Sequence, residues 1–285
     1  MNGLSLYSGI GGLDLGLERA GITVVGQVEI DPFCQRVLAK HWPEVPRHDD
    51  VRTCPEWWRS QPRPRVDLVC GGFPCQGHSV AGKQHGEEDE RWGWPAFRDV
   101  INATNPPLVL IENVPNLTRT GLLTVLQDLA DRGFDAWWFR VPAAAFGAPH
   151  LRWRLFTIAA HPQRIELRVE PWRSGWSSWP RTALIGFDGA TWALADPDSK
   201  TGGPSARLAG PRSSAAEAGL GTQEPGRRIV SLGRGPWTAE PGVDRVAPRV
   251  PARVDRLKAL GNAVVPQVAE YIGHLILAGI EETAA

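Results

Sequence analysis

Reactive side chains stand at the ends of three apolar runs in this chain of 285 residues. Cys75 follows the run VDLVCGGFP, and Glu112 closes the run PLVLIENV. Arg152 and Arg154 alternate along HLRWRLFTIA, so we expect both on one face of a strand. A thiolate is a nucleophile, a buried carboxyl group moves protons, and guanidinium groups stabilise negative charge. Together these types predict nucleophilic catalysis with proton transfer.

Each of these residues also has an ordinary structural explanation. Buried cysteines are common packing residues, which is how we interpret Cys70 inside its apolar run, and exposed arginines often do no more than solvate a surface. Cys75 differs because it follows the strand, and ligands of open α/β sheets bind beyond the carboxyl ends of strands. The cysteines form no CxxC pair, so we expect free thiols, no disulfide and no metal site at Cys34, Cys54, Cys70 and Cys75.

A glycine turn near the start of the chain predicts a cofactor site. The segment YSGIGGLDLG places a turn between a strand and a helix, where backbone N–H groups can approach a ligand. The spacing of Gly9, Gly11 and Gly12 is not GxGxxG, so the turn alone is a weak signal. Glu29 closes the second strand, where an acid accepts bonds from ribose hydroxyls, and Asp50 follows a third strand. A dinucleotide enzyme and a nucleoside-cofactor methyltransferase both fit this pattern.

Strands and helices alternate over the first 160 residues, which favours a doubly wound, mostly parallel α/β sheet. Continuous apolar runs suit strands buried on both faces. We expect strands at 3–8, 23–29, 66–72, 107–114, 136–143 and 154–160. We expect helices at 11–21, 32–42, 120–134 and 264–280.

The composition changes after residue 160, which predicts three segments. Residues 1–160 form a catalytic and cofactor-binding domain, residues 161–250 a small irregular second domain, and residues 251–285 return to complete the first. Residues 160–256 hold 14 Lys and Arg against 10 Asp and Glu, whereas residues 1–159 hold 16 against 18. The basic excess of the middle segment permits a polyanionic partner without demonstrating one.

The overall composition is that of an ordinary globular protein. Hydrophobic residues make up 42% of the chain, and its formal net charge is +0. We find no uninterrupted apolar run of about 18 residues and no basic, cleavable leader, so we expect no membrane span and a cytoplasmic location. We also expect a monomer.

Seven segments, in chain order, resemble motifs of the DNA (cytosine-5) methyltransferase family. They are YSGIGG, VEID, HDDV, GGFPCQGHSVAGKQHGEEDER, IENV, HLRWRLF and ALGNAVVPQ. They cover residues 4–160 and 253–275, and Pro-Cys-Gln followed by Glu-Asn-Val is a highly specific combination. Residues 161–250 correspond to the target-recognition domain of this family by position only.

The resemblance implies a Rossmann-like enzyme that uses S-adenosylmethionine and acts on double-stranded DNA. In that family pattern Cys75 attacks carbon 6 of a cytosine, and Glu112 contacts ring nitrogen 3. Arg154 contacts oxygen 2, and Arg152 completes the catalytic set. The implied cofactor-binding residues are Tyr7, Gly9, Ile10, Gly11, Gly12, Glu29, Ile30, Asp50, Val51, Pro74 and Asn262.

This chemistry makes two demands on the site. A free thiol has a pKa of about 8.5, so Cys75 needs nearby positive charge, from Arg152 or Arg154, or concerted loss of its proton. Glu112 must carry a proton to donate to the base, and burial raises a carboxyl pKa in that direction. The base must also leave the duplex, and the glycine-rich loop after Cys75, whose composition extends as far as Phe97, suits a lid that closes on it.

The chain departs from the family pattern at four positions: Ser5 replaces an acid, Tyr7 a phenylalanine, Ile30 a larger residue and His150 a glutamine. Three other functions remain open at this stage. An RNA cytosine methyltransferase has the same motifs, and a dinucleotide oxidoreductase explains the glycine turn and Glu29 alone. A DNA-binding protein without activity is disfavoured by the intact catalytic residues.

Overall fold

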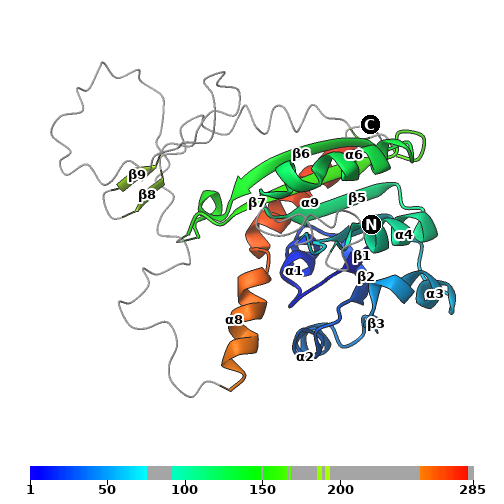
Figure 1. Cartoon of the computed structure of the whole chain (residues 1–285), viewed down its shortest axis with the longest axis horizontal. Helices are drawn as coiled ribbons and strands as arrows, with labels where there is room; N and C mark the ends of the chain where they lie inside the picture. The colour runs from blue at the N-terminus through cyan, green and yellow to red at the C-terminus, as the bar shows by residue number, and fades with distance from the viewer. Residues whose placement is uncertain are drawn as a thin grey trace.

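A computed structural model describes residues 1–75, 92–148, 150–165, 167 and 251–281, together with the backbone of 185–187 and 190–192. Its main feature is a seven-stranded sheet in the order β3-β2-β1-β4-β5-β7-β6 (Figure 1). The strands are β1 (Asn2–Leu6), β2 (Thr23–Val28), β3 (Arg47–His48), β4 (Leu68–Gly71), β5 (Leu108–Asn113), β6 (Asp135–Pro142) and β7 (Trp153–Ala160). A separate pair consists of β8 (Ile185–Phe187) and β9 (Ala190–Trp192).

Six of the seven strands of this sheet run in one direction, and β7 runs in the opposite one. β3, β2, β1, β4 and β5 pair in parallel with one another, whereas β7 runs antiparallel to both β5 and β6. Because β7 is reversed, its beginning lies at the edge where β5 ends, with Leu155 opposite Asn113. The predicted doubly wound, mostly parallel sheet is therefore confirmed, and its reversed strand places Arg154 next to the carboxyl ends of the others.

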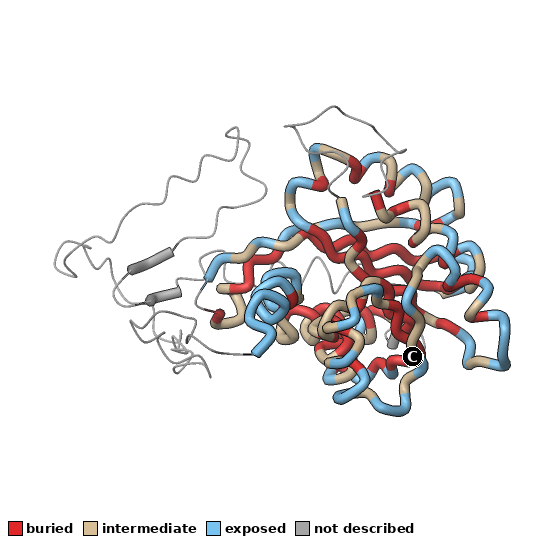
Figure 2. The backbone as a smooth tube through the Cα atoms, turned by 60° about the horizontal axis from the view of Figure 1, so that its bottom comes forward, coloured by how far each residue is buried: buried red, intermediate tan, exposed pale blue. Residues whose placement is uncertain are grey.

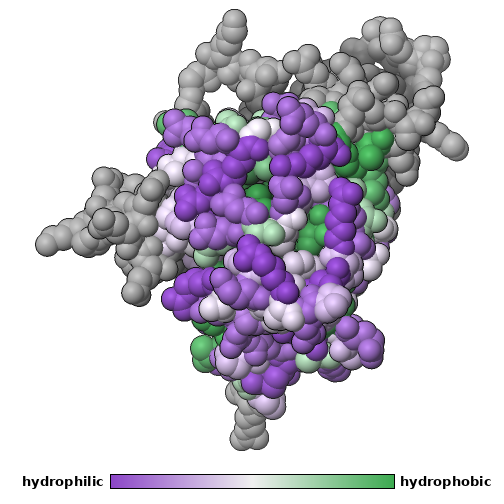
Figure 3. All heavy atoms as spheres, turned by 90° about the vertical axis from the view of Figure 1, so that its right-hand side faces the viewer, coloured by the Kyte–Doolittle hydropathy of each residue, from purple (hydrophilic) through white to green (hydrophobic). Residues whose placement is uncertain are grey.

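Two layers of helices cover the sheet. The helices are α1 (Gly12–Arg19), α2 (Pro32–His41), α3 (Cys54–Arg59), α4 (Trp94–Thr104), α5 (Leu117–Thr120), α6 (Leu122–Ala130), α8 (Arg253–Asn262) and α9 (Pro266–Glu281). Alternate residues of β5 enter two cores: Val109 and Ile111 pack with α3, α4 and α6, and Leu108 and Leu110 pack with α1 and α9. The central strands β4 and β5 are consequently buried on both faces (Figure 2). The surface seen in Figure 3 is mostly hydrophilic in its described part.

The helix α9 closes the domain against α1. A Cβ atom on Gly16 would collide with Pro266 and Ala269, so only glycine allows these two helices to approach so closely. Among the described residues, one helical stretch, Arg253–Ile280, is long and apolar enough to be a candidate membrane span. Helices in protein cores meet the same criterion, and Ile272 of this stretch is fully buried with α1 in one core.

The structure differs from the sequence-based expectations at several points. The region after Cys75 has the composition of a loop as far as Phe97, but α4 already begins at Trp94, with Pro95 in its first turn. The helix expected at 120–134 is broken at Gly121 into α5 and α6. Arg152 precedes β7 and is not part of the strand. Residues 76–91 of the proposed lid and most of 161–250 lie outside the described residues.

Candidate active site at the carboxyl edge of the sheet

The carbonyl groups of the two residues before Cys75 both accept hydrogen bonds. The amide of Asn113, at the end of β5, donates to the carbonyl of Phe73 at 3.0 Å. The Gly93 N–H donates to the carbonyl of Pro74 at 2.9 Å, and the Tyr7 hydroxyl donates to the carbonyl of Gly93 at 2.9 Å. Pro74 therefore reaches the glycine turn through Gly93 and Tyr7, as its predicted cofactor role requires.

Glu112 is the buried acid of this edge. Its side chain lies against Gly72, where an added Cβ atom would stand 2.6 Å from the carboxyl Oε2. Burial raises the pKa of Glu112 to about 7, although the positive charges of Arg154 and Arg152 oppose that rise. Arg154 directs its Nε to Oε1 of Glu112 at 2.8 Å. The carboxyl group is thus poised to gain or lose a proton near neutral pH.

Cys75 is a half-buried free thiol beside this carboxyl group. Burial raises its pKa above 9.0, and the negative charge of Glu112 adds to the rise. Activation of the thiol by Arg152 or Arg154 therefore stays a prediction. Concerted proton loss is the alternative that fits a neutral thiol.

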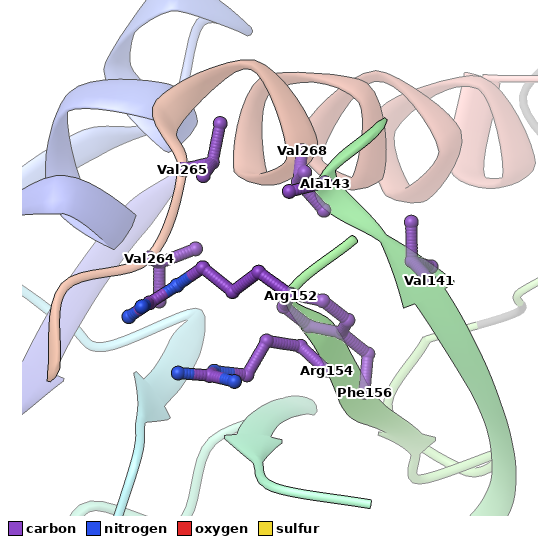
Figure 4. A pocket seen from close by; sticks show the side chains of 8 residues that line it. All are labelled: Val141, Ala143, Arg152, Arg154, Phe156, Val264, Val265 and Val268. Atoms are coloured by element: carbon purple, nitrogen blue, oxygen red, sulfur yellow. The ribbon is translucent and has the colours of Figure 1, made fainter. Parts of the chain in front are cut away.

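Arg152 has different partners from Arg154. Its Nη2 donates to the carbonyl oxygens of Gly261 and Ala263, each at 2.6 Å. The two side chains run in the same direction, with Arg152 next to Val264 (Figure 4). They line a cavity of about 10 Å³, which is only large enough for one water molecule.

The glycine turn and Glu29 form the second half of the edge. The backbone turns with positive φ at Tyr7, Gly9 and Gly11. The Glu29 carboxylate accepts from the N–H groups of Gly9 and Asp31, both at 2.7 Å. A Cβ atom on Gly9 would have nothing within 4 Å, so the space over the turn is open.

The remaining predicted cofactor residues surround that space or support it. Ile30 is 65% exposed beside Glu29 and offers an apolar surface. Asp50 caps the short helix that begins at Val51, and Arg52 holds the pKa of Asp50 below its usual value. Asn262 ends α8 and is exposed, as is His150. An open turn, an aimed carboxylate and an exposed apolar side chain fit a nucleoside cofactor.

A buried polar network below the turn was missed from the sequence. Asp14 accepts from the Ser5 hydroxyl at 2.6 Å and from the Gln27 amide at 2.8 Å. Ser8 donates to the Ser5 hydroxyl at 2.9 Å, which connects the network to the turn. Burial raises the pKa of Asp14 to about 6. Ser5, noted above only as a departure from the family pattern, was the available signal. Among the described residues, no group of three acids, histidines or cysteines could hold a metal ion.

Comparisons with known proteins agree with this geometry. The family model for C-5 cytosine-specific DNA methylase matches residues 1–180. The chain is 37% identical over 173 residues to the Type II methyltransferase M2.BsuMI of Bacillus subtilis, covering 56% of this chain and 42% of that protein. It is 33% identical over 163 residues to M.NgoMIV of Neisseria gonorrhoeae, covering 55% and 50%.

A solved structure described as a putative DNA modification methyltransferase encoded within a prophage of E. coli is 27% identical. It matches with a TM-score of 0.49 and covers 60% of this chain and 49% of that one. The chain spans about half the length, or less, of the curated relatives named above. Since the family model covers more than half of the chain, the protein belongs to the C-5 cytosine-specific DNA methylases.

Proposed function

We propose that this protein transfers a methyl group from S-adenosylmethionine to carbon 5 of a flipped-out cytosine in a specific sequence of double-stranded DNA. Family membership already identifies it as a cytosine-specific DNA methylase and removes the dinucleotide oxidoreductase from consideration. The observation that carries the finer proposal is the buried Glu112, which has a pKa of about 7 and is paired with Arg154 beside the thiol of Cys75.

The first step is attack of the Cys75 sulfur on carbon 6 of the cytosine. Because the thiol is neutral in the free protein, its proton must leave as the carbon–sulfur bond forms. Electron density then moves onto the base, and protonated Glu112 donates a hydrogen bond to ring nitrogen 3. Arg154 holds the Glu112 carboxyl group and provides a cation for cytosine oxygen 2.

The second step is methylation of carbon 5, which the attack has made nucleophilic. Bound S-adenosylmethionine supplies an electrophilic methyl group. Glu29 would accept the ribose hydroxyls, Ile30 would contact the adenine, and the turn at Gly9–Gly12 would lie under the cofactor. S-adenosylhomocysteine leaves as the second product. Solvent water accepts the proton of carbon 5, whose bonding electrons form the double bond between carbons 5 and 6. The carbon–sulfur bond breaks with its electron pair on the Cys75 sulfur, which takes up a proton and restores the free thiol.

Bisulfite sequencing of DNA from cells that express the chain tests this proposal. We expect cytosines in one recurrent sequence to be methylated, and no such marks with the Cys75→Ala variant. Marks on RNA with none on DNA would favour an RNA cytosine methyltransferase instead. The relatives are named Type II methyltransferases, which supports a role in restriction–modification for this chain.

We further propose that residues 161–250 form the target-recognition domain. The described part of residues 1–160 forms the sheet and its candidate site, and α8 and α9 complete that domain. The intervening segment supplies arginines that can bind guanine edges or phosphates. Exchanging 161–250 for the matching segment of a relative with another target should move methylation to the target of that relative. An active chimera that keeps the original target would contradict this assignment.

A further inference from the structure

Arg152, just before the beginning of β7, binds the segment Gly261–Val265. This segment, called here the α8–α9 joint, comprises the last two residues of α8 and the link to α9. Its Nη2 donates to two carbonyl oxygens of that joint, which are 109 and 111 positions away in the sequence. Arg154, only two residues further on, binds Glu112 instead. The two arginines of the HLRWRLF segment therefore serve different parts of the edge.

The backbone at Arg152 is shaped for this contact. Its φ of 36° is positive, a conformation that residues other than glycine rarely adopt. Such a conformation persists only where the surroundings hold it. On one side the carbonyl of Leu151 accepts from the Ala143 N–H at 2.7 Å, and on the other side β7 begins at Trp153. The unusual turn between these anchors directs the guanidinium toward the joint.

The joint reaches the cofactor half of the edge. A Cβ atom on Gly12 would collide with the carbonyl oxygen of Val264 and lie 3.2 Å from its nitrogen. The backbone of the joint therefore packs directly on the first residue of α1, where the glycine turn ends. The stem of Arg152 runs alongside Val264 in the same small cavity (Figure 4). Displacing the joint would move the support of the glycine turn.

We propose that Arg152 is a positioning residue for cofactor binding, which acts by holding the α8–α9 joint against the glycine turn. The inference rests on the proposed function, since the cofactor it names is S-adenosylmethionine. It assigns Arg152 a task separate from that of Arg154. A direct role of Arg152 in holding cytosine would leave cofactor affinity in the absence of DNA unchanged.

Calorimetric binding of S-adenosylmethionine to the full chain without DNA separates these roles. Arg152→Met keeps the apolar stem and removes the donors, so we expect about tenfold weaker binding, with Arg152→Lys between that variant and the wild type. Arg154→Met should bind the cofactor as the wild type does. Arg140→Met is the matched control, because Arg140 on the neighbouring strand β6 is exposed and contacts Thr118.

Hydrogen exchange at the amides of 259–268 provides the second measurement and should be faster in Arg152→Met. Wild-type cofactor affinity in Arg152→Met, or an equal loss in Arg154→Met, would overturn the proposal. If Arg152→Met does not fold, Arg152→Lys provides the test. Faster amide hydrogen exchange in the joint of this variant, with unchanged affinity for S-adenosylmethionine, would also overturn the proposal. A wild-type chain that binds no S-adenosylmethionine would instead contradict the proposed function.

Discussion

The two halves of the carboxyl edge treat their ionisable groups in opposite ways. On the cofactor half, Glu29 accepts two backbone N–H groups, and Asp31 and Asp50 have lowered pKa values because of Lys258 and Arg52. On the catalytic half, burial raises the pKa values of Glu112 and Cys75. The first half keeps Asp31 and Asp50 charged, whereas the second half favours the uncharged forms of Glu112 and Cys75.

This difference follows from what each half must do. Fixed charge suits groups that accept bonds from hydroxyls, because an ionised carboxylate is a strong acceptor in every state of the protein. Proton transfer instead requires a group whose pKa lies near the working pH. The sheet separates the two needs by solvent access: Asp31 and Asp50 face solvent, whereas Glu112 is enclosed by β4, β5 and β7.

The largest effect is expected from removing the nucleophile of the catalytic half. Cys75→Ala should abolish methyl transfer, by a factor of at least about 10⁴, while S-adenosylmethionine binding remains. The measurement is incorporation of labelled methyl groups into DNA, with calorimetry for the cofactor. Cys34→Ala is the control, because Cys34 is a buried packing residue of α2. Methyl transfer by the Cys75→Ala variant would show that Cys75 is not the nucleophile.

The second prediction concerns the pH dependence of the catalytic half. The active form needs protonated Glu112, which is lost as pH rises through its pKa of about 7, and the neutral thiol of Cys75, whose pKa is raised by burial. Because the thiol proton leaves only as the carbon–sulfur bond forms, single-turnover kcat/KM should be level below pH 7 and fall above it, by up to about tenfold per unit.

In Glu112→Gln the amide donor does not titrate. The rate should be about 10²-fold lower at pH 7 and should not fall as pH rises above 7. A wild-type profile that stays level or rises between pH 7 and 9 would show that protonated Glu112 is not required.

A smaller effect is expected on the cofactor half. Glu29→Ala should weaken S-adenosylmethionine binding by about 10- to 100-fold and DNA binding much less, because of the two ligands only the cofactor is proposed to contact this carboxylate. Glu44→Ala, an exposed acid near the same strands, is the control. Equal losses for both ligands would show that Glu29 supports the fold of the edge and does not bind the cofactor.

The smallest functional effect is expected from Asp14, the exception on the cofactor half. Its pKa of about 6 in the fold exceeds the unfolded value of 3.8, so its contribution to stability is complete below pH 3.8 and is lost as pH rises through 6. Asn does not ionise, so Asp14→Asn should not lose stability as pH rises. At pH 8 its free energy of unfolding should exceed that of the wild type by up to ~3 kcal/mol.

Thermal and urea unfolding at pH 5 and pH 8 measure this change, with the exposed Asp49→Asn as the control. A variant that is less stable at pH 8 would mean that ionised Asp14 holds the network together. In that case the cofactor half keeps even its buried acid charged, and the contrast with the catalytic half would become sharper.

Much of the fold could be predicted because the strands carry strong local signals. The strands expected at 23–29, 66–72 and 107–114 correspond to β2, β4 and β5. The helix α4 was missed because its amphipathic residues directly follow glycine and charge, and because its burial depends on packing with Phe73. Such long-range packing leaves no mark in local periodicity.

The sequence indicated which residues belong to the candidate site but not which partners they bind. Strand-end positions indicated Cys75 and Glu112, because parallel strands end at a common edge. Arg154 lies near the beginning of β7, and it reaches the same edge because β7 runs antiparallel to β5. Nothing in the sequence reveals that Arg152 binds carbonyl groups of the α8–α9 joint, since backbone acceptors are the same in every residue. The Ser5–Asp14 pair was equally hidden, because each residue alone is an ordinary polar residue.

The close contact between α1 and α9 has a consequence for how the protein is made. Residues that touch there, such as Gly16 and Ala269, are separated by about 250 positions, so the contact forms only after the roughly 250 residues that follow α1 have left the ribosome. Until then Leu13 and Leu17 present an uncovered apolar face. Nascent chains should therefore be chaperone substrates, and domain completion should be a late, slow event in synthesis.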